Sequence, residues 1–267
     1  MSKLSQAQTE LREMDALAAE DSPLHRLHPL CKLIVTIVYI VTVVSFPKYD
    51  FTGLVVMALY PALMFQAAGI SVKLCFYKMR IVLPLVCAVG LANPFLDRTT
   101  LMQLGTIPVS GGMVSMLTLM LKGVFSLMAS FLLIATTPMD SLCAALRKLH
   151  VPGILTTLLL LTYRYIGVML EEVSVMSQAY KLRAPGQKGV HISAWGSFLG
   201  QLLLRSMDRA QELYNSMLLR GFHGEFFYAH VPPCRLSGLL YTTACVAAFL
   251  CARYFNITGL LGSLFVG

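Results

Sequence analysis

The sequence has few charged residues for its length, and this shortage decides the class of protein. Only 13% of its 267 residues are Asp, Glu, Lys or Arg, whereas 57% are hydrophobic. A soluble domain has about a quarter of its residues charged. The chain therefore has too little polar surface to cover a water-soluble globule, and we expect an integral membrane protein.

Several motifs of catalysis and ligand binding are also missing. No G-x-x-x-x-G-K-[ST] phosphate loop, no H-E-x-x-H zinc motif and no G-x-S-x-G nucleophile motif occurs. The seven cysteines are odd in number and contain no C-x-x-C pair, which argues against a disulfide framework or a cysteine metal site. We therefore expect no catalytic residue, no metal site and no cofactor bound by this chain.

Five apolar runs have the composition of membrane-spanning helices. They lie at 33–47, 51–70, 81–96, 114–135 and 236–254. Each is close to the roughly 20 residues that a helix needs to cross a bilayer, if flanking residues are counted. The sequence thus predicts an all-α integral membrane protein with about five transmembrane helices.

A sixth apolar run, at 154–170, is interpreted differently. Arg164 interrupts it, and Glu171 and Glu172 follow at once. If the N-terminus is cytoplasmic, four spans return the chain to the cytoplasm before this run. A fifth span here would place most of the later basic residues outside, against the positive-inside rule. We expect a helix that is buried against other helices or lies at the membrane interface.

The distribution of basic residues gives the orientation. Of the 21 Lys and Arg residues, only Lys48, Arg98 and Arg253 fall in segments that this topology places outside, and Lys122 lies inside a span. The net charge of +8 is therefore an orientation signal, and a nucleic-acid partner is not expected. We expect a multi-pass protein of the plasma (inner) membrane with a cytoplasmic N-terminus.

This topology divides the chain into four segments. They are an N-terminal cytoplasmic or interfacial segment (1–30), four transmembrane helices (31–136), cytoplasmic helices (137–235), and the last transmembrane helix with its tail (236–267). Proline and glycine positions predict three helices in the third segment, at about 137–149, 152–183 and 193–220.

The last of these three helices has an apolar stripe. Its members recur at helical spacing: Leu203, Met207, Ala210, Tyr214 and Met217. The helix at 152–183 has a matching stripe of Met169, Val173, Met176 and Tyr180. We expect the two stripes to pack together, in two long helices that cross or run antiparallel.

A tripeptide with a central arginine ends each of the two long cytoplasmic helices. The tripeptides are Leu182, Arg183, Ala184 and Leu219, Arg220, Gly221. Two interpretations are open from the residues alone. The arginine can complement the negative end of the helix dipole. Alternatively, each planar guanidinium can bind an acidic pocket on a partner protein.

Four other residues are candidates for function. His25 and His28 have a spacing that metal ligands on a helix can have, but positions at the membrane interface explain them better. Lys122 and Arg164 lie in apolar runs, where a charge faces protein or water. Either could line a substrate pathway, but we favour structural roles, with a glutamate at 171 or 172, or a neighbouring helix, as the partner of Arg164.

Three segments of the chain carry a family resemblance. Residues 22–33 read SPLHRLHPLCKL, residues 205–210 read RSMDRA, and residues 217–225 read MLLRGFHGE. The first is similar to an HxLDPRxKL entry to a first span, and the others to a RxxDRAxxxxxAMxARGFxGE stretch. In these residues the chain resembles the transmembrane T components of energy-coupling factor transporters, closest to the cobalt-type CbiQ proteins.

The resemblance implies a function and partners. It implies a non-catalytic scaffold whose three cytoplasmic helices form a coupling unit, with Arg183 and Arg220 docked on two P-loop ATPase subunits that bind ATP. It also implies a separate, metal-binding membrane subunit for substrate, with cobalt or nickel as the substrate. A stand-alone secondary transporter that uses Lys122 or Arg164 is the alternative.

Overall fold

The computed structural model describes residues 3–47, 51–96, 100–104, 107–186, 189–224 and 236–254. For 3–5, 51–52, 92–96, 100–104 and 107–111 it describes the backbone alone. Parts of the predicted segments therefore lie outside the described residues, namely 187–188 of the loop between the long cytoplasmic helices, 225–235 and 255–267.

The chain forms two compact units, which we describe separately. The bundle unit comprises Ala18–Pro138 and Val231–Gly267, and the hairpin unit comprises Met1–Leu17 and Met139–His230. The four-segment division drawn from the sequence remains a prediction.

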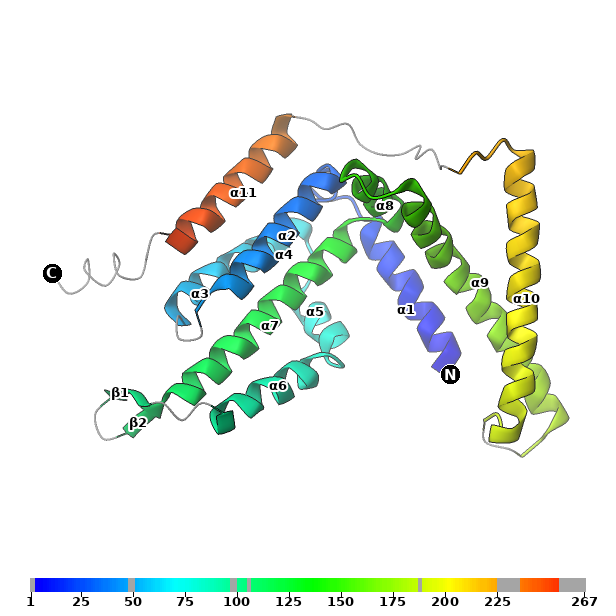
Figure 1. Ribbon diagram of the computed structural model, residues 1–267, viewed down its shortest axis with the longest axis horizontal. Helices are drawn as coiled ribbons and strands as arrows, with labels where there is room; N and C mark the ends of the chain where they lie inside the picture. Colours follow the sequence, from blue (N-terminus) through cyan, green and yellow to red (C-terminus); the bar gives the residue numbers. More distant parts are fainter. Residues whose placement is uncertain are drawn as a thin grey trace. The chain divides into compact units, whose positions relative to one another are not determined.

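The regular elements among the described residues of the bundle unit are helices and one short pair of strands. Its elements are α2 (Pro29–Ser45), α3 (Phe51–Met57), α4 (Leu59–Ala68), α5 (Val72–Met79), α6 (Leu83–Leu96), β1 (Thr100–Leu104), β2 (Ile107–Ser110), α7 (Gly111–Thr136) and α11 (Leu236–Tyr254). The two strands are antiparallel, with Leu104 opposite Ile107, and they lie between α6 and α7 (Figure 1). They are a small departure from the all-α prediction, because so short a pair leaves no signal in hydropathy.

The helices are mainly apolar, but their lengths differ from the predicted spans. Three described helices, α7, α9 (Gly153–Arg183) and α11, are long and apolar enough to cross a membrane. The helical stretches Gly53–Ala68 and Val72–Met79 pass the same test as a pair bent by 112°. The predicted spans at 33–47 and 81–96 are represented by α2 and α6, which have only 17 and 14 residues.

Hydrogen bonds at the two ends of α2 fix its direction relative to α7. At its start, the buried Lys32 ammonium donates to the carbonyl of Thr136, the last residue of α7, at 2.7 Å. At its end, Lys122 of α7 donates to the carbonyls of Val44 at 3.2 Å and Phe46 at 2.5 Å. The two helices are therefore antiparallel, and α7 ends on the side where α2 begins.

Helix α11 runs parallel to α2. Near its start, a Cβ built on the buried Gly238 would lie 3.3 Å from Cys31 Sγ. Near its end, Arg253 donates to the Ser45 carbonyl at 3.3 Å, and its guanidinium lies 5.2 Å from the Phe46 ring centroid. Thus α11 begins on the side where α2 begins and α7 ends.

The buried interior of the bundle holds a triangle of aromatic rings. The ring centroids of Tyr39, Tyr60 and Phe249 are 4.7, 5.3 and 5.0 Å apart, so α2, α4 and α11 meet there. Helix α6 lies along α7 (Figure 1), and the approach is close: a Cβ at Gly123 would lie 2.4 Å from Val86 Cγ1. Small residues allow such close helix contacts in membranes.

A proline accounts for the break between α3 and α4. Pro61 has no N–H to donate to the carbonyl of Met57, four residues earlier, so that carbonyl loses its helical partner. The Tyr39 hydroxyl of α2 donates to it at 2.9 Å in a fully buried position. The bilayer core has no water to bond an unpaired carbonyl, so this bond from Tyr39 makes the broken helix tolerable.

The hairpin unit contains the helices that the sequence predicts after the fourth apolar run. They are α8 (Met139–Lys148), α9 (Gly153–Arg183) and α10 (Ile192–Leu219), and each end lies within two residues of the predicted one. The N-terminal helix α1 (Lys3–Ala18) belongs almost entirely to this unit.

The Tyr39 bond yields the first prediction. Tyr39→Phe should lower the unfolding free energy of the detergent-purified protein by about 1 kcal/mol, because the Met57 carbonyl becomes unpaired. Pro61→Ala supplies an N–H at that position, so the Tyr39→Phe cost should shrink in the Pro61→Ala background. Equal costs in both backgrounds, measured in a double-mutant cycle, would show that the hydroxyl does not serve the orphaned carbonyl.

Candidate functional site

The two predicted arginine tripeptides lie at the C-terminal ends of α9 and α10. Arg183 is the last residue of α9, and Arg220 is the residue that caps α10. Both arginines are exposed, and neither pairs with a carboxylate among the described residues. The leucine that precedes each arginine is also strongly exposed, at 84% for Leu182 and 90% for Leu219.

Helix α10 ends in a motif in which backbone N–H groups, and not the Arg220 side chain, bond the terminal carbonyls. The backbone N–H of Phe222 donates to the Met217 carbonyl at 3.0 Å, and that of Gly221 donates to the Leu218 carbonyl at 3.0 Å. This pair of bonds is the Schellman motif, and it needs the left-handed φ of +80° that Gly221 adopts. The terminal carbonyls therefore already have backbone partners, which weakens the interpretation of Arg220 as a mere cap.

The two arginines lie at opposite ends of an antiparallel helical hairpin. The N–H of His191, just before α10, donates to the Tyr180 hydroxyl near the end of α9 at 3.3 Å. Arg220 lines a hollow with Leu161 and Arg164, near the start of α9. At 1.5 Å per residue, the 19 residues from Arg164 to Arg183 put the two tips roughly 28 Å apart.

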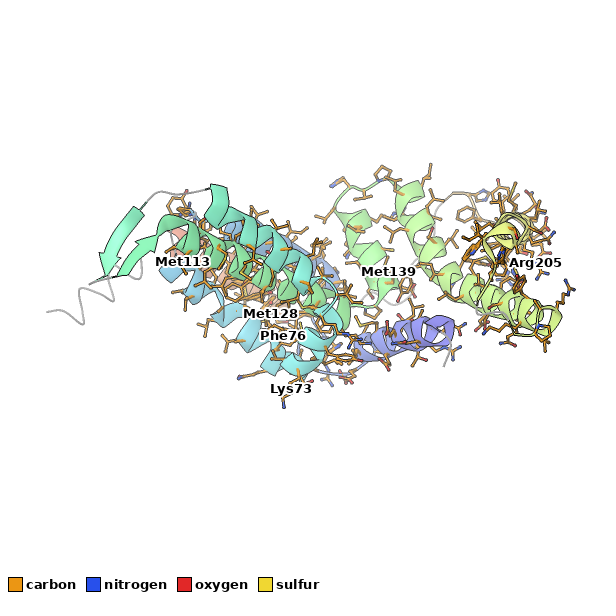
Figure 2. All side chains as sticks on the ribbon, turned by 90° about the horizontal axis from the view of Figure 1, so that it is seen from below. Lys73, Phe76, Met113, Met128, Met139 and Arg205 are labelled. Atoms are coloured by element: carbon orange, nitrogen blue, oxygen red, sulfur yellow. The ribbon has the colours of Figure 1, made fainter. Side chains whose placement is uncertain are left out.

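The seam between the two helices is only partly closed. Arg205 of α10 forms an ion pair with Glu172 of α9 near the middle (Figure 2). Toward the start of α9, an apolar cavity of about 450 Å³ separates the helices and is lined by residues of both, among them Leu158, Leu213 and Met217.

The predicted packing of the two apolar stripes is therefore wrong in part. Met217 is buried, but Leu203 and Met207 are each 61% exposed and Tyr214 is 51% exposed. Helical periodicity identifies an apolar face without identifying what covers it. Here the helices cross (Figure 1), so α9 covers only part of the α10 stripe.

The prediction that Arg164 pairs with Glu171 or Glu172 is also wrong. Glu171 pairs with Arg12 of α1, and Glu172 pairs with Arg205. Arg164 instead lies beside Arg220 and His223 around a hollow of about 750 Å³. This end of the hairpin therefore presents a cluster of basic groups.

Lys122 has a structural position. Its ammonium donates to two terminal carbonyls of α2, and it has no carboxylate partner among the described residues. Helix α2 rises only about 25 Å over its length, short of a hydrocarbon core of about 30 Å. Its last carbonyls therefore need donors from neighbouring helices, and Lys122 and Arg253 supply them.

The two candidate metal-binding histidines serve the backbone. His28 caps α2 by accepting a hydrogen bond from the Leu30 N–H at 3.1 Å. The His25 ring contacts Ser22 Oγ at 2.6 Å and the Ala135 carbonyl at 3.3 Å. Within the described ranges, no group of three or more possible metal ligands is found.

Sequence reasoning missed the attachment of α1 to α9. The Tyr163 hydroxyl donates to the Asp15 carboxylate at 2.5 Å, and Arg12 donates to Glu171 at 3.4 Å. The paired residues are about 150 positions apart, so no local pattern relates them. The sequence placed Arg12 and Asp15 only in an N-terminal cytoplasmic or interfacial segment (1–30).

These features define a multi-pass helical membrane protein that also contains a charged helical hairpin. A family model described as a cobalt transport protein, CbiQ, matches residues 20–229. The chain belongs to this family, and membrane transport is its function.

Individual relatives agree with the family. A cobalt transport protein CbiQ of Rhodobacter capsulatus is 27% identical over 217 residues, 80% of this chain and 86% of the relative. An energy-coupling factor transporter transmembrane protein EcfT of Leuconostoc gelidum is 27% identical over 76% of this chain and 80% of its own length. A nickel permease LarQ of Lactiplantibacillus plantarum is 32% identical over 34% of this chain and 33% of its own length.

The position of Lys122 yields the second prediction. Lys122→Met leaves the Val44 and Phe46 carbonyls without their donor and should lower stability by about 1–2 kcal/mol, whereas Lys122→Arg should retain most of it. Lys73→Met on the exposed side of α5 (Figure 2) is the matched control and should be nearly silent. If Lys122→Met abolishes transport with unchanged thermal stability, Lys122 belongs to a pathway instead.

Proposed function

We propose that this chain is the T component of an energy-coupling factor importer. In this role α8, α9 and α10 are coupling helices, and the chain transmits the motion of two partner ATPases to a separate membrane subunit that binds the substrate. The observation that carries the proposal is the pair of exposed Leu-Arg tips at opposite ends of the hairpin. Two tips that lie this far apart fit contact with two separate ATPase subunits better than contact with a single subunit.

The chemistry of the tips favours a protein partner. An exposed large apolar side chain beside an unpaired guanidinium provides both apolar burial and a bidentate donor for a carboxylate. At Arg220 the helix carbonyls already have backbone partners, so the side chain is available for an external acid. The relatives named as energy-coupling factor transmembrane proteins support the same assignment.

The direction of the bundle helices supports a hairpin that stays on one side of the membrane. Because α7 ends and α11 begins on the same side, the chain between them makes no net crossing. If α9 crossed, α10 would have to cross back. Four charged residues lie near the middle of α10, and each would cost about 2.5–3.5 kcal/mol at the bilayer centre. We infer that neither helix crosses, although α9 is apolar and long enough to do so.

The basic residues support the proposal that this side faces the cytoplasm and that the membrane is the plasma (inner) membrane. In this topology Lys32, Lys73 and Arg80 lie at the cytoplasmic ends of the bundle helices, and the N-terminus is cytoplasmic. ATP is bound by the partners, and this chain is a non-catalytic subunit. Within the described residues of the hairpin, the acidic side chains of α9 pair with basic residues of α1 and α10.

The mechanism is mechanical. When ATP draws the two ATPases together, the tips of α9 and α10 move with them. The lever formed by the long helices changes the orientation of the substrate-binding subunit. Cobalt or nickel is the proposed substrate, held by that subunit, and the names of the CbiQ and LarQ relatives support these two metals.

The alternative, a secondary transporter that acts alone, finds less support. It needs a charged group in a pathway, and Lys122 is instead bonded to the end of α2. Arg164 lies on the hairpin beside Arg220.

The third prediction separates coupling from capping. Arg183→Glu with Arg220→Glu should abolish Co²⁺ uptake and release the ATPases, because a like charge would face an acidic pocket. Arg→Lys should rescue only in part, since a lysine lacks the guanidinium fork. A cap alone would make Lys nearly silent, because the dipole term is worth about 0.3–1 kcal/mol for either cation.

Arg80 is the matched control for this experiment. It caps the C-terminus of α5 and is exposed, but it has no proposed coupling role. Arg80→Glu should leave the ATPases attached. Uptake and co-purification are measured for all variants, and a double Glu variant with normal uptake and bound ATPases would refute the coupling assignment.

The fourth prediction concerns topology. With native cysteines replaced, Gln178→Cys on α9 should be protected from an impermeant thiol reagent in intact cells and should react in inverted vesicles. Met113→Cys at the start of α7 should show the opposite pattern. Labelling of Gln178→Cys from outside would place the end of α9 across the membrane.

A further inference from the structure

Helix α1 is attached to α9 by two side-chain pairs. Tyr163 donates to Asp15 at 2.5 Å, and Arg12 donates to Glu171 at 3.4 Å. Arg12 and Asp15 are three residues apart and so share one face of α1. Their partners on α9, Tyr163 and Glu171, are eight residues apart, about 12 Å along the helix axis. With a single contact α1 could rotate about that contact. Two separated contacts fix the direction of α1 along α9.

The two pairs differ in strength. The side chains of Arg12 and Glu171 are 78% and 62% exposed, and such exposed ion pairs contribute little. The bond between Tyr163 and Asp15 has the short length typical of a hydroxyl that donates to a carboxylate, and the Tyr163 side chain is half-buried. Asp15 and Tyr163 therefore form the principal joint.

The segment after α1 is firmly held in the bundle unit. The chain leaves the hairpin unit at Leu17, and Ala18 and Leu24 are already buried at 7% and 5% exposure. Arg26 pairs with both carboxylate oxygens of Asp21 at 2.8 and 2.7 Å, and this hydrogen bonding lowers the pKa of Asp21. This pair is exposed and local to the segment, so the burial of Leu24 is what holds the segment in the bundle unit.

This segment also contacts the two helices that fix the bundle. The His25 ring lies 3.3 Å from the Ala135 carbonyl at the end of α7. Lys32, in the first turn of α2, donates to the His25 carbonyl at 3.3 Å. The segment that follows α1 is thus bonded to the start of α2 and the end of α7.

We propose that α1 is a strap that moves with α9 and carries its motion into the bundle, with Asp15 and Tyr163 as positioning residues. The strap gives α9 a second covalent route to the bundle unit, in addition to the route through α8. This inference rests on the proposed function, because the ATPases supply the motion of α9.

The test measures coupling in the complete transporter. Asp15→Asn and Tyr163→Phe complexes, with both ATPases and the substrate-binding subunit, are reconstituted in liposomes with Co²⁺. The number of Co²⁺ ions transported per ATP hydrolysed should fall by about three- to tenfold in either variant, the factor expected for one net hydrogen bond. The double variant should fall no further than the single ones, because both changes remove the same bond.

Glu10→Gln is the matched control. It removes a carboxylate from the same helix, where the hydrogen-bond partner of Glu10 is Gln6 of α1 itself, and its coupling ratio should be unchanged. The ATPases should remain attached in every strap variant. Loss of ATPases in the Arg183 and Arg220 variants tests the proposed function separately, so the two ideas can fail independently.

A cross-link tests whether the strap moves as one body with α9. Arg12→Cys and Glu171→Cys, joined by a short bis-maleimide in a background without native cysteines, should retain the full coupling ratio. Loss of transport in the cross-linked protein would mean that α1 must leave α9 and would overturn the proposal. Unchanged coupling in both Asp15→Asn and Tyr163→Phe would overturn it as well.

Discussion

The lack of water in a bilayer core requires every backbone carbonyl there to find a partner within the protein, and the bundle depends on this requirement. Helix α2 is too short to reach across the hydrocarbon, and the helix after it is broken by a proline. The carbonyls that these defects release are bonded by Lys122, Arg253 and Tyr39. At the end of α7, Lys32 likewise donates to the Thr136 carbonyl. These donors fix α2, α7 and α11 in their directions.

The direction of the helices then constrains the hairpin. Because α7 ends where α11 begins, the chain between them must return to the side that it left. By hydropathy alone α9 is a candidate span. The charged middle of α10 makes a return crossing costly, and this cost supports the proposal that neither helix crosses. In that proposal the hairpin acts as a lever outside the bilayer, with its tips roughly 28 Å apart.

Much of this could be predicted from the sequence, and the reasons are local. Apolar runs, prolines and glycines determine where helices begin and end, so the bounds of α8, α9 and α10 were close. The exposed tips at Arg183 and Arg220 follow from the same local signals. Their docking on ATPases remains a prediction, as nothing in one chain contains the partner.

The remaining features depend on contacts between distant residues. The Glu171 pair with Arg12 and the Asp15 pair with Tyr163 join positions that share no periodicity. The exposure of Met207 shows the same limit, since a stripe predicts an apolar face but not its cover. Pro61 is a local signal for a break in the run 51–70, but nothing in the local sequence relates Tyr39 to the carbonyl that this break releases.

The central claim is that the two hairpin tips move with the ATPases. Spin labels at Lys181 and Ser216, both exposed and each within about one helical turn of its arginine, report the distance between the tips. In the purified complex this distance is measured by pulsed electron paramagnetic resonance, without nucleotide and with ATP trapped. The account predicts that the distance shortens by several ångströms in the trapped state. An identical distance distribution in both states would contradict it.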